Sequence, residues 1–477
     1  MDMSATAAHA VHAGGSSDHH PKGLYVLFAT EMWERFSYYS MLAMFTLYLR
    51  DTTGEGFAWT SDNATKLYAN YLMFVYASPL IGGWLADRKL GYRRAVMIGG
   101  LFFMAGHLLL SFRSMTAVYA ALTCLVIGNG LFKPNISAMV GNLYPEGSHL
   151  KDRAYNIFYM GINVGAFLAP VVAEFVKGRF GFHIAFAVAA FGMLISVTIL
   201  WKFKRHIEGA DAARLDRSSK TLAHGSAVAV DAPPASVSHQ DASNASRQGT
   251  MDAVPEWKRI GALIIIFLIV IVFWMVFHQN GSTMTYWANE NTDWDAMGLD
   301  VSGIISNAIN PLWVMILTFP LVAFWRWLDN KGMEPSTPVK MAIGMFLTGA
   351  AFFVLYLGAK VGEGSVAGEL TGDNRWAYKV SAMWLIGAYG VLTLGELMLS
   401  PMGLSLVSKV APVRFRGVMM GGWFMATAIG NKLTQIGALW DDWLHSTFWL
   451  LLAGLAAFMG MVLLFLLRPL KKAMPGV

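Results

Sequence analysis

The chain has 477 residues, of which 55% are hydrophobic and 14% are charged, and its formal net charge is +6. Soluble globular domains carry about 25% charged residues, so the composition excludes a protein of that class. The single cysteine excludes a disulfide within the chain. The small positive balance is weak evidence for nucleic acid, and basic residues gathered between apolar segments are better explained as topology signals. We therefore expect a membrane protein with no nucleic-acid partner.

The first 21 residues are rich in Ala, Gly, Ser, His and Asp. They show no basic region followed by an apolar core and a small-residue cleavage site, so they predict a disordered tail and not a signal peptide. The histidines of this tail have no cysteine or carboxylate cluster at ligand spacing. We expect neither a metal site nor a cofactor in this chain.

Twelve apolar segments follow, each close to the roughly 20 residues that a helix needs to cross a bilayer. They cover residues 23–49, 67–86, 94–112, 115–135, 154–177, 183–203, 259–280, 303–327, 338–359, 380–400, 417–438 and 446–467. The sequence thus predicts an all-α membrane protein with twelve transmembrane helices.

A polar stretch at residues 206–256 contains "DAPPASVSHQDASNASRQG" and predicts a flexible linker, because such a composition cannot bury a core. It separates two predicted six-helix bundles, at residues 22–205 and 257–470, and residues 471–477 form a short tail. Lysine and arginine concentrate in the connections on the side of this linker and of both chain ends. The positive-inside rule therefore places the linker and both termini in the cytoplasm.

The two predicted bundles echo each other in sequence. "GNGLFKPNISAMVGNLYP" begins at Gly128, and "GELMLSPMGLSLVSKVAP" begins at Gly395. Three glycine or proline pairs are related by the same offset of 267: Gly128 with Gly395, Pro134 with Pro401, and Pro145 with Pro412. Two six-helix halves in the same orientation are the plan of the major facilitator fold, where substrate lies between the halves near the bilayer midplane.

Charged residues inside the predicted spans point to function, since an ionisable group at membrane depth costs roughly 2.5–3.5 kcal/mol on insertion scales. In "EMWERFSYY", Glu31, Glu34 and Arg35 are spaced i, i+3 and i+4, so they share one face of a helix. Lys133 stands alone on the fourth span, next to Pro134, and is the obvious second base. Two acids and two bases balance, and protonation of one acid would release a base. The triad alone could also be a structural salt bridge.

Glu396 is the corresponding charge in the second half. The repeat makes it the counterpart of Asn129, and it makes Ser400 the counterpart of Lys133. Two positive groups would thus face one negative group across the cavity. A zwitterion that bridges the halves would find its carboxylate held by Arg35 and Lys133 and its amine by Glu396, because the planar fork of arginine suits a carboxylate.

Three aromatic side chains are further pocket candidates. Trp274 and Trp423 lie in the middle of their spans and could form walls. His278 lies deep in "FWMVFHQNG" and could belong either to the pocket or to a gate.

Several motifs together resemble the proton-dependent oligopeptide transporter family, a branch of the major facilitator superfamily. "EMWERFSYY" is similar to the family's E-x-x-E-R-F-x-Y-Y signature, and "GGWLADRKLG" resembles the superfamily's loop motif between the second and third helices. "GNGLFKPN", "FYMGINVGAF", "INPLW" and "GELMLSPMGLS" resemble further family stretches in the expected order. The resemblance touches both halves of the chain.

The resemblance implies roles for individual residues. Proton coupling would fall to Glu31, Glu34, Arg35 and Lys133. Peptide binding would fall to Arg35, Tyr39, Tyr76, Lys133, Tyr159, Asn163, Trp274, Asn310, Glu396, Ser400 and Trp423, with His278 a candidate for the same pocket. The chain departs from many relatives at Leu42, where they carry a second arginine, and at His278, where they carry an acid.

These patterns lead us to expect a proton-coupled symporter that imports di- and tripeptides by rocker-switch alternating access. It would act as a monomer in the bacterial inner membrane. An enzyme is not expected, since the sequence shows no nucleophile motif, metal-ligand cluster or phosphate loop. One alternative is a transporter of the same fold for another anion, such as nitrate, or for a drug-like carboxylate. A channel is a second alternative, although a twofold repeat with a charged midplane suits alternating access better.

Overall fold

The computed structural model describes residues 19–144, 150–211, 254–368, 370 and 376–475. Most of the predicted N-terminal tail, residues 212–253 of the predicted linker, and Pro145 of the repeat lie outside the described residues.

The first half of the chain forms five long elements. They are α1 (Lys22–Arg50), α2 (Ser61–Leu85) with its π-helical continuation η1 (Ala86–Leu90), α3 (Tyr92–Leu110), α4 (Met115–Asn142) and α5 (Leu150–Lys202), followed by η2 (Lys204–His206). Two helices are joined within α5 at Gly181, whose φ of 82° is a left-handed value that other residues rarely adopt. This bend separates the predicted spans 154–177 and 183–203.

The second half contains more interruptions. Its helices are α8 (Glu256–Phe277), η3 (His278–Gly281), α9 (Thr283–Glu290), η4 (Asp295–Met297), η5 (Gly303–Ala308), α10 (Ile309–Asn330), α11 (Thr337–Ser365), α12 (Ala382–Val410), η7 (Val413–Phe415), α13 (Arg416–Leu433), η8 (Thr434–Asp441), α14 (His445–Phe465) and α15 (Leu467–Ala473). Two short strands, β1 (Thr292–Asp293) and β2 (Val380–Ser381), pair in parallel, with Thr292 opposite Val380.

Each of the twelve predicted spans falls mainly on helix; the exceptions are the two β2 residues that begin the tenth and residues 111–112, 203 and 466 at or near the ends of three others. Eight helices of the described chain are long and apolar enough to cross a bilayer. The helical state follows from the solvent, since hydrocarbon offers no partner for backbone polar groups and a helix pairs them internally. The prediction of an all-α membrane protein is confirmed. The seventh span is not one uninterrupted helix, because α8 gives way at His278 to the short turn η3.

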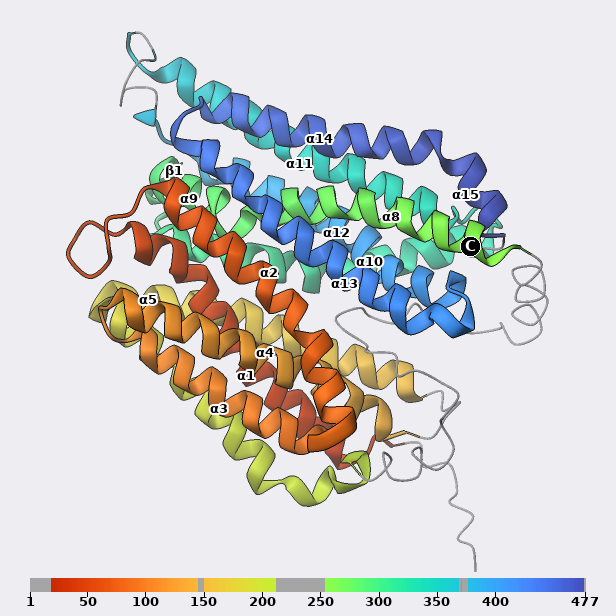
Figure 1. Ribbon diagram of the computed structural model, residues 1–477. Helices are drawn as coiled ribbons and strands as arrows, with labels where there is room; N and C mark the ends of the chain where they lie inside the picture. The colour runs from red at the N-terminus through yellow and green to blue at the C-terminus, as the bar shows by residue number, and fades with distance from the viewer. Residues whose placement is uncertain (1–18, 145–149, 212–253, 369, 371–375, 476–477) are drawn as a thin grey trace, which may run out of the picture.

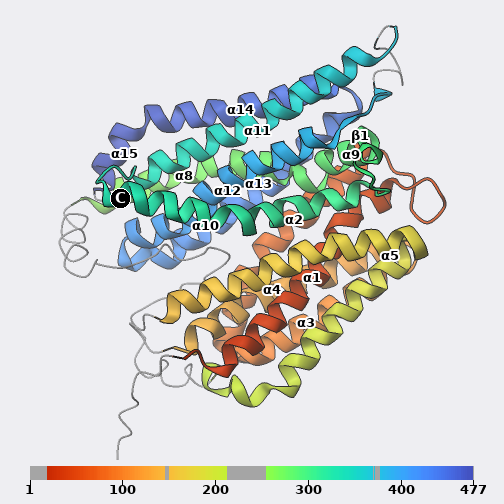
Figure 2. The ribbon, with the colours of Figure 1, turned by 180° about the vertical axis from the view of Figure 1, so that it is seen from behind.

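The helices form two groups, α1–α5 and α8–α15, that lie side by side (Figure 1). The groups approach most closely at the end where β1 and α9 lie, and they diverge toward the end where the C-terminus lies, as the reverse view in Figure 2 also shows.

Polar contacts join the two groups at the end opposite the C-terminus. Arg50 Nη1 lies 2.6 Å from Glu290 Oε1, and the hydroxyl of Thr46 donates to the carbonyl of Gly281 at 3.0 Å. Three more contacts of this kind link Ser61 N to Asp441, Lys432 to Asn70, and Ser302 N to Glu174. The described structure is therefore closed at this end by hydrogen bonds between the halves.

The sequence repeat reappears as repeated helix packing. A Cβ at Gly128 of α4 would lie 3.0 Å from the carbonyl oxygen of Gly99 in α3, and a Cβ at Gly395 of α12 would lie 2.8 Å from that of Gly344 in α11. A side chain at Gly395 would not fit without a shift of its neighbours, and one at Gly128 would be in unusually tight contact, so each pair of helices approaches through glycine. The predicted correspondence between Gly128 and Gly395 thus has the same physical cause in both halves.

The first helical group extends beyond the predicted boundary at residue 205. Residues 208–211 form a helical turn, Ile207 and Ala210 are fully buried, and Asn142 donates to the carbonyl of Ala210 at 3.1 Å. Asp211 also lies 3.8 Å from Arg93. These residues pack onto α3 and α4 because they add apolar side chains and an ion pair to an otherwise polar stretch.

Candidate functional site

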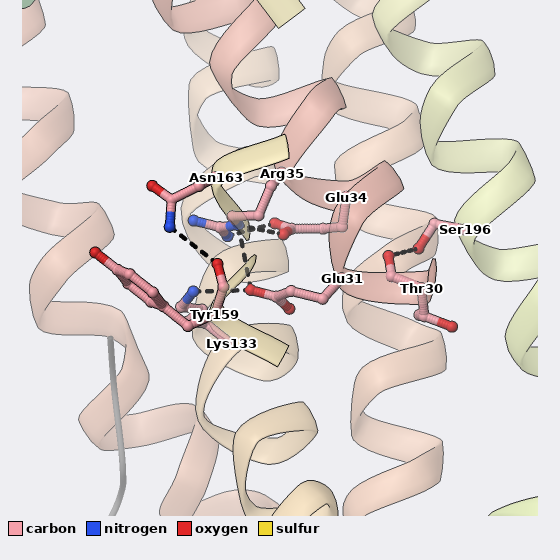
Figure 3. A network of polar contacts seen from close by, with 8 residues as sticks. All are labelled: Thr30, Glu31, Glu34, Arg35, Lys133, Tyr159, Asn163 and Ser196. Atoms are coloured by element: carbon pink, nitrogen blue, oxygen red, sulfur yellow. Dashed lines mark hydrogen bonds and ion pairs between the residues drawn. The ribbon is translucent and has the colours of Figure 1, made fainter. Parts of the chain in front are cut away.

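Four charged side chains meet inside the first helical group (Figure 3). Glu34 and Arg35 of α1 form a two-pronged pair, with Nε to Oε2 at 2.5 Å and Nη2 to Oε1 at 2.6 Å. Glu31, one turn earlier, places Oε1 2.8 Å from Lys133 Nζ of α4 and 3.5 Å from Arg35 Nε. The predicted set is thus brought together as two linked ion pairs.

This charge cluster is removed from water. Glu31 and Glu34 are fully buried, and Arg35 and Lys133 expose only 4% and 3% of their surface. Two acids and two bases cancel, which is the condition under which buried charges are tolerated. One oxygen, Glu31 Oε2, is buried without a hydrogen-bond partner among the described residues. The cluster is therefore balanced in charge but not fully saturated in hydrogen bonds.

The two bases line a small pocket between the halves. Arg35 also lies over the rings of Tyr38 and Tyr39, with its guanidinium carbon 4.9 and 5.8 Å from their centroids. The pocket is completed by residues of α1, α2, α4 and α13, namely Tyr38, Val75, Tyr76, Pro79, Asn129 and Phe424. Both bases can thus be approached from the space between the helical groups.

A larger cavity adjoins this pocket and holds the remaining predicted substrate residues. Its walls include Tyr39, Tyr76, Tyr159, Asn163, Trp274, His278, Asn310, Glu396, Ser400 and Trp423, which come from both halves. Tyr38, Tyr76 and Phe424 line both spaces and mark the boundary between them. We expected Arg35 and Lys133 to share the wall of one cavity with Glu396. The structure places them in the neighbouring pocket, because aromatic side chains from α1, α2 and α13 meet in between.

Glu396 is held by neighbours within the second half. Asn310 Nδ2, from the start of α10, donates to Glu396 Oε2 at 2.9 Å and to the hydroxyl oxygen of Thr393 at 3.0 Å. The carboxylate therefore stands at the cavity wall in a defined orientation. It can accept further N–H donors, which is the chemistry that a primary ammonium group needs.

Aromatic rings form the wall near the break in the seventh span. His278 stacks on Trp274 with ring centroids 5.3 Å apart, and it meets Tyr76 edge-on at 5.6 Å. Nitrogen Nε2 of His278 is buried without a hydrogen-bond partner among the described residues. Of the two possibilities left open by the sequence, this position belongs to the pocket wall.

The structure adds lining residues that the sequence did not single out. The polar ones include Asn280, Asn307, Tyr389 and Thr427. Two of them could have been predicted from their spacing to residues already chosen. Asn307 lies three residues before Asn310, and Tyr389 lies seven before Glu396, spacings that put each pair on one face of a helix. Leu42, where the sequence departs from the pattern expected from the family resemblance, also lines the cavity. Its apolar side chain leaves the cationic side of the site to Arg35 and Lys133.

Comparison of the chain with known proteins shows its family. The family model described as the POT family matches residues 93–441. The chain belongs to the POT family. The first-helix signature lies before the matched interval, but full-length POT-family relatives extend over it. A transporter of Bacillus subtilis (strain 168), YclF, is 31% identical over 96% of each chain. A di-/tripeptide transporter of Lactococcus lactis subsp. cremoris is 31% identical over 96% of this chain and 97% of its own.

Solved structures of the POT family agree with this placement. A peptide transporter POT variant in complex with sulfate is 29% identical, covers 96% of both chains and superposes with a TM-score of 0.80. The same variant in complex with alafosfalin gives a TM-score of 0.79 at 28% identity. The predicted fold class and the predicted family are both confirmed.

Proposed function

We propose that this protein is a proton-coupled symporter that imports di- and tripeptides. In this proposal Arg35 and Lys133 hold the peptide carboxylate, Glu396 holds the amine, and the Glu31/Glu34 set carries the proton. The names of the relatives support a peptide substrate, since they include di-/tripeptide transporters of Lactococcus lactis and a dipeptide and tripeptide permease A of Escherichia coli.

One observation carries the proposal most directly: acid and base stand in adjoining spaces between the two halves. Glu396 lines the cavity, and Arg35 and Lys133 line the pocket beyond Tyr38, Tyr76 and Phe424. A molecule with a cation at one end and a carboxylate at the other matches this polarity. A simple anion would leave Glu396 as an uncompensated negative charge close to it, which favours a zwitterion.

The ion pairs of α1 supply a coupling mechanism. In the described state Glu34 forms an ion pair with Arg35, and Glu31 forms one with Lys133. Protonation of one acid would weaken its hold on a base and release that base to the peptide carboxylate. Loss of the proton would restore the pair and displace the peptide. Proton and peptide thereby favour the same conformations, which is the thermodynamic requirement for symport.

Orientation follows from the distribution of basic residues. The positive-inside rule places the linker and both termini in the cytoplasm. The end joined by the Arg50–Glu290 pair then faces outward, so the structure corresponds to a state closed to the outside. Opening on that side would require the contacts between Arg50, Thr46 and the second half to break.

Uptake of labelled dialanine into proteoliposomes tests the proposal. An inward proton gradient should stimulate accumulation several-fold over vesicles without a gradient, and a protonophore should abolish the difference. Unlabelled dialanine should compete, whereas nitrate and an N-acetylated dipeptide should compete poorly. Gradient-independent flux that never saturates would instead point to a channel, and competition by simple anions alone would point to an anion carrier.

Loss of the outer ion pair should shift the conformational balance. Replacement of Arg50 by glutamine removes its contact with Glu290, a partly exposed pair worth at most about 1 kcal/mol. The population of outward-open molecules should therefore rise by up to about fivefold. Spin labels at Thr53 and Asp295, in a Cys124→Ser background, would report this as a larger fraction of long distances.

The matched control is Lys66→Gln. Lys66 pairs with Asp62 of its own helix at 2.7 Å, so its loss removes a similar surface ion pair without touching the contact between halves. Unchanged distances in Arg50→Gln, or an equal change in both variants, would show that the Arg50–Glu290 pair does not hold the outer end closed.

A further inference from the structure

A hydrogen-bonded chain of three residues stands behind Glu396. Thr393 precedes Glu396 by three residues on α12, and it is fully buried. Its hydroxyl donates to the carbonyl of Tyr389 at 2.7 Å and accepts from Asn310 Nδ2 at 3.0 Å. Asn310 Nδ2 in turn donates to Glu396 Oε2 at 2.9 Å. Thr393 thus reaches the candidate amine site only through Asn310.

The donor and acceptor of each of these hydrogen bonds are fixed by the acceptor groups at the two ends of the series. A carbonyl oxygen only accepts, so the single hydroxyl hydrogen of Thr393 is used on Tyr389 and its oxygen can only accept from Asn310. An ionised Glu396 also only accepts. Both neighbours therefore require the NH2 group of Asn310, and both amide hydrogens are engaged. The opposite amide orientation would place Oδ1 against two acceptors.

Fixing the amide matters when a peptide arrives. A primary ammonium group that binds Glu396 shares the carboxylate with Asn310, since a carboxylate accepts several donors. The bond to Thr393 fixes the Asn310 amide independently of Glu396, so the NH2 group keeps its orientation while the ammonium binds. With both amide hydrogens engaged, Glu396 and Asn310 Oδ1 remain hydrogen-bond acceptors, which suits an ammonium and disfavours a carbonyl-bearing amide.

We propose that Thr393 is a positioning residue that makes the Glu396–Asn310 site selective for a free amino terminus. This inference rests on the proposed function, because it assigns the amine end of the substrate to Glu396. It differs from a general packing role, since it predicts an effect on one end of the substrate only.

The test compares Thr393→Val with Thr393→Ser. Valine keeps the shape but removes the hydroxyl. The dissociation constant and KM for dialanine should rise about fivefold, the factor expected for one lost hydrogen bond, with little change in maximum rate. Affinity for N-acetyl-dialanine should not change, so discrimination between the two ligands should fall by the same factor. Serine restores the hydroxyl and should restore discrimination.

Thr318→Val serves as the control, because Thr318 of α10 makes the same kind of bond to the carbonyl four residues earlier, at 2.6 Å, without touching Asn310. Melting temperatures in detergent identify variants that fail to fold. Thr393→Val with unchanged discrimination, equal loss for both ligands, or no recovery with serine would overturn the positioning role. Failure of the proposed function shows separately, as wild-type protein that does not prefer dialanine over its N-acetyl form.

Discussion

Replacement of Lys133 by alanine is expected to abolish proton-driven peptide accumulation. Lys133 pairs with Glu31 at 2.8 Å within a fully buried cluster of two acids and two bases. Without it, two carboxylates face Arg35 alone and one negative charge is uncompensated. Stranding a buried charge costs roughly 3–5 kcal/mol, so the cluster should instead bind a proton permanently. A proton that cannot leave cannot be coupled to transport.

The measurement is dialanine uptake into proteoliposomes with and without an inward proton gradient. In Lys133→Ala the gradient-driven uptake should fall by a factor of about ten or more, which corresponds to a loss of about 1.4 kcal/mol or more in coupling free energy. Glu34→Gln should do the same for a different reason, since it removes an acid that carries the proton in the proposed cycle and weakens the two-pronged pair with Arg35.

A double variant separates coupling from stability. Glu31→Gln together with Lys133→Ala removes one acid and one base and leaves the Glu34–Arg35 pair balanced. Its melting temperature should recover toward that of the wild type, while gradient-driven uptake should remain lost. Gradient stimulation at wild-type strength in Lys133→Ala would rule out the coupling role of this lysine.

Replacement of Glu396 by glutamine should have the largest effect on recognition. Glutamine keeps the size and can still accept from Asn310, but it removes the charge that would pair with the peptide ammonium. A hydrogen bond to a charged group contributes about 1.5–3 kcal/mol, so the dissociation constant for dialanine should rise between about 10-fold and 150-fold. N-acetyl-dialanine has no ammonium and should bind equally to both proteins.

Glu363→Gln is the matched control. Glu363 is a buried acid of the same half, and it accepts from Ser446 N and Oγ at 2.9 and 2.7 Å. Its neutralisation should lower the melting temperature without changing the preference for dialanine over its N-acetyl form. If Glu396→Gln also preserved that preference, the peptide amine would have to bind elsewhere.

The two principal predictions concern different ends of one substrate. The α1–α4 cluster should control whether a gradient drives transport, and the Glu396 site should control which ligand is held. A variant of the cluster that retains dialanine binding but loses gradient stimulation would show the two functions to be separable. The boundary formed by Tyr38, Tyr76 and Phe424 is consistent with this division, since it lies between the two sites.

Much of the architecture could be predicted because lipid imposes strong rules on sequence. Apolar segments of about 20 residues, separated by polar loops, located the helices. The offset of 267 between Gly128 and Gly395 anticipated two places where helix backbones meet without side chains. Two predicted details differ from the structure: the seventh span was expected to be one continuous helix, and the first bundle was expected to end at residue 205. The turn at His278 and the packed residues 207–211 depend on contacts with other helices, which hydropathy does not encode.

The sequence by itself determined which chemical groups stand at membrane depth, since charges there are rare and costly enough to be conspicuous. It placed Glu31, Glu34 and Arg35 on one helix face by their spacing, and it opposed Arg35 and Lys133 to Glu396 through the repeat. Only the tertiary structure decided the partners: Glu34 with Arg35, Glu31 with Lys133, and Asn310 between Glu396 and Thr393. The physical reason is that spacing fixes faces within one helix, whereas hydrogen bonds of about 3 Å depend on how several helices pack together.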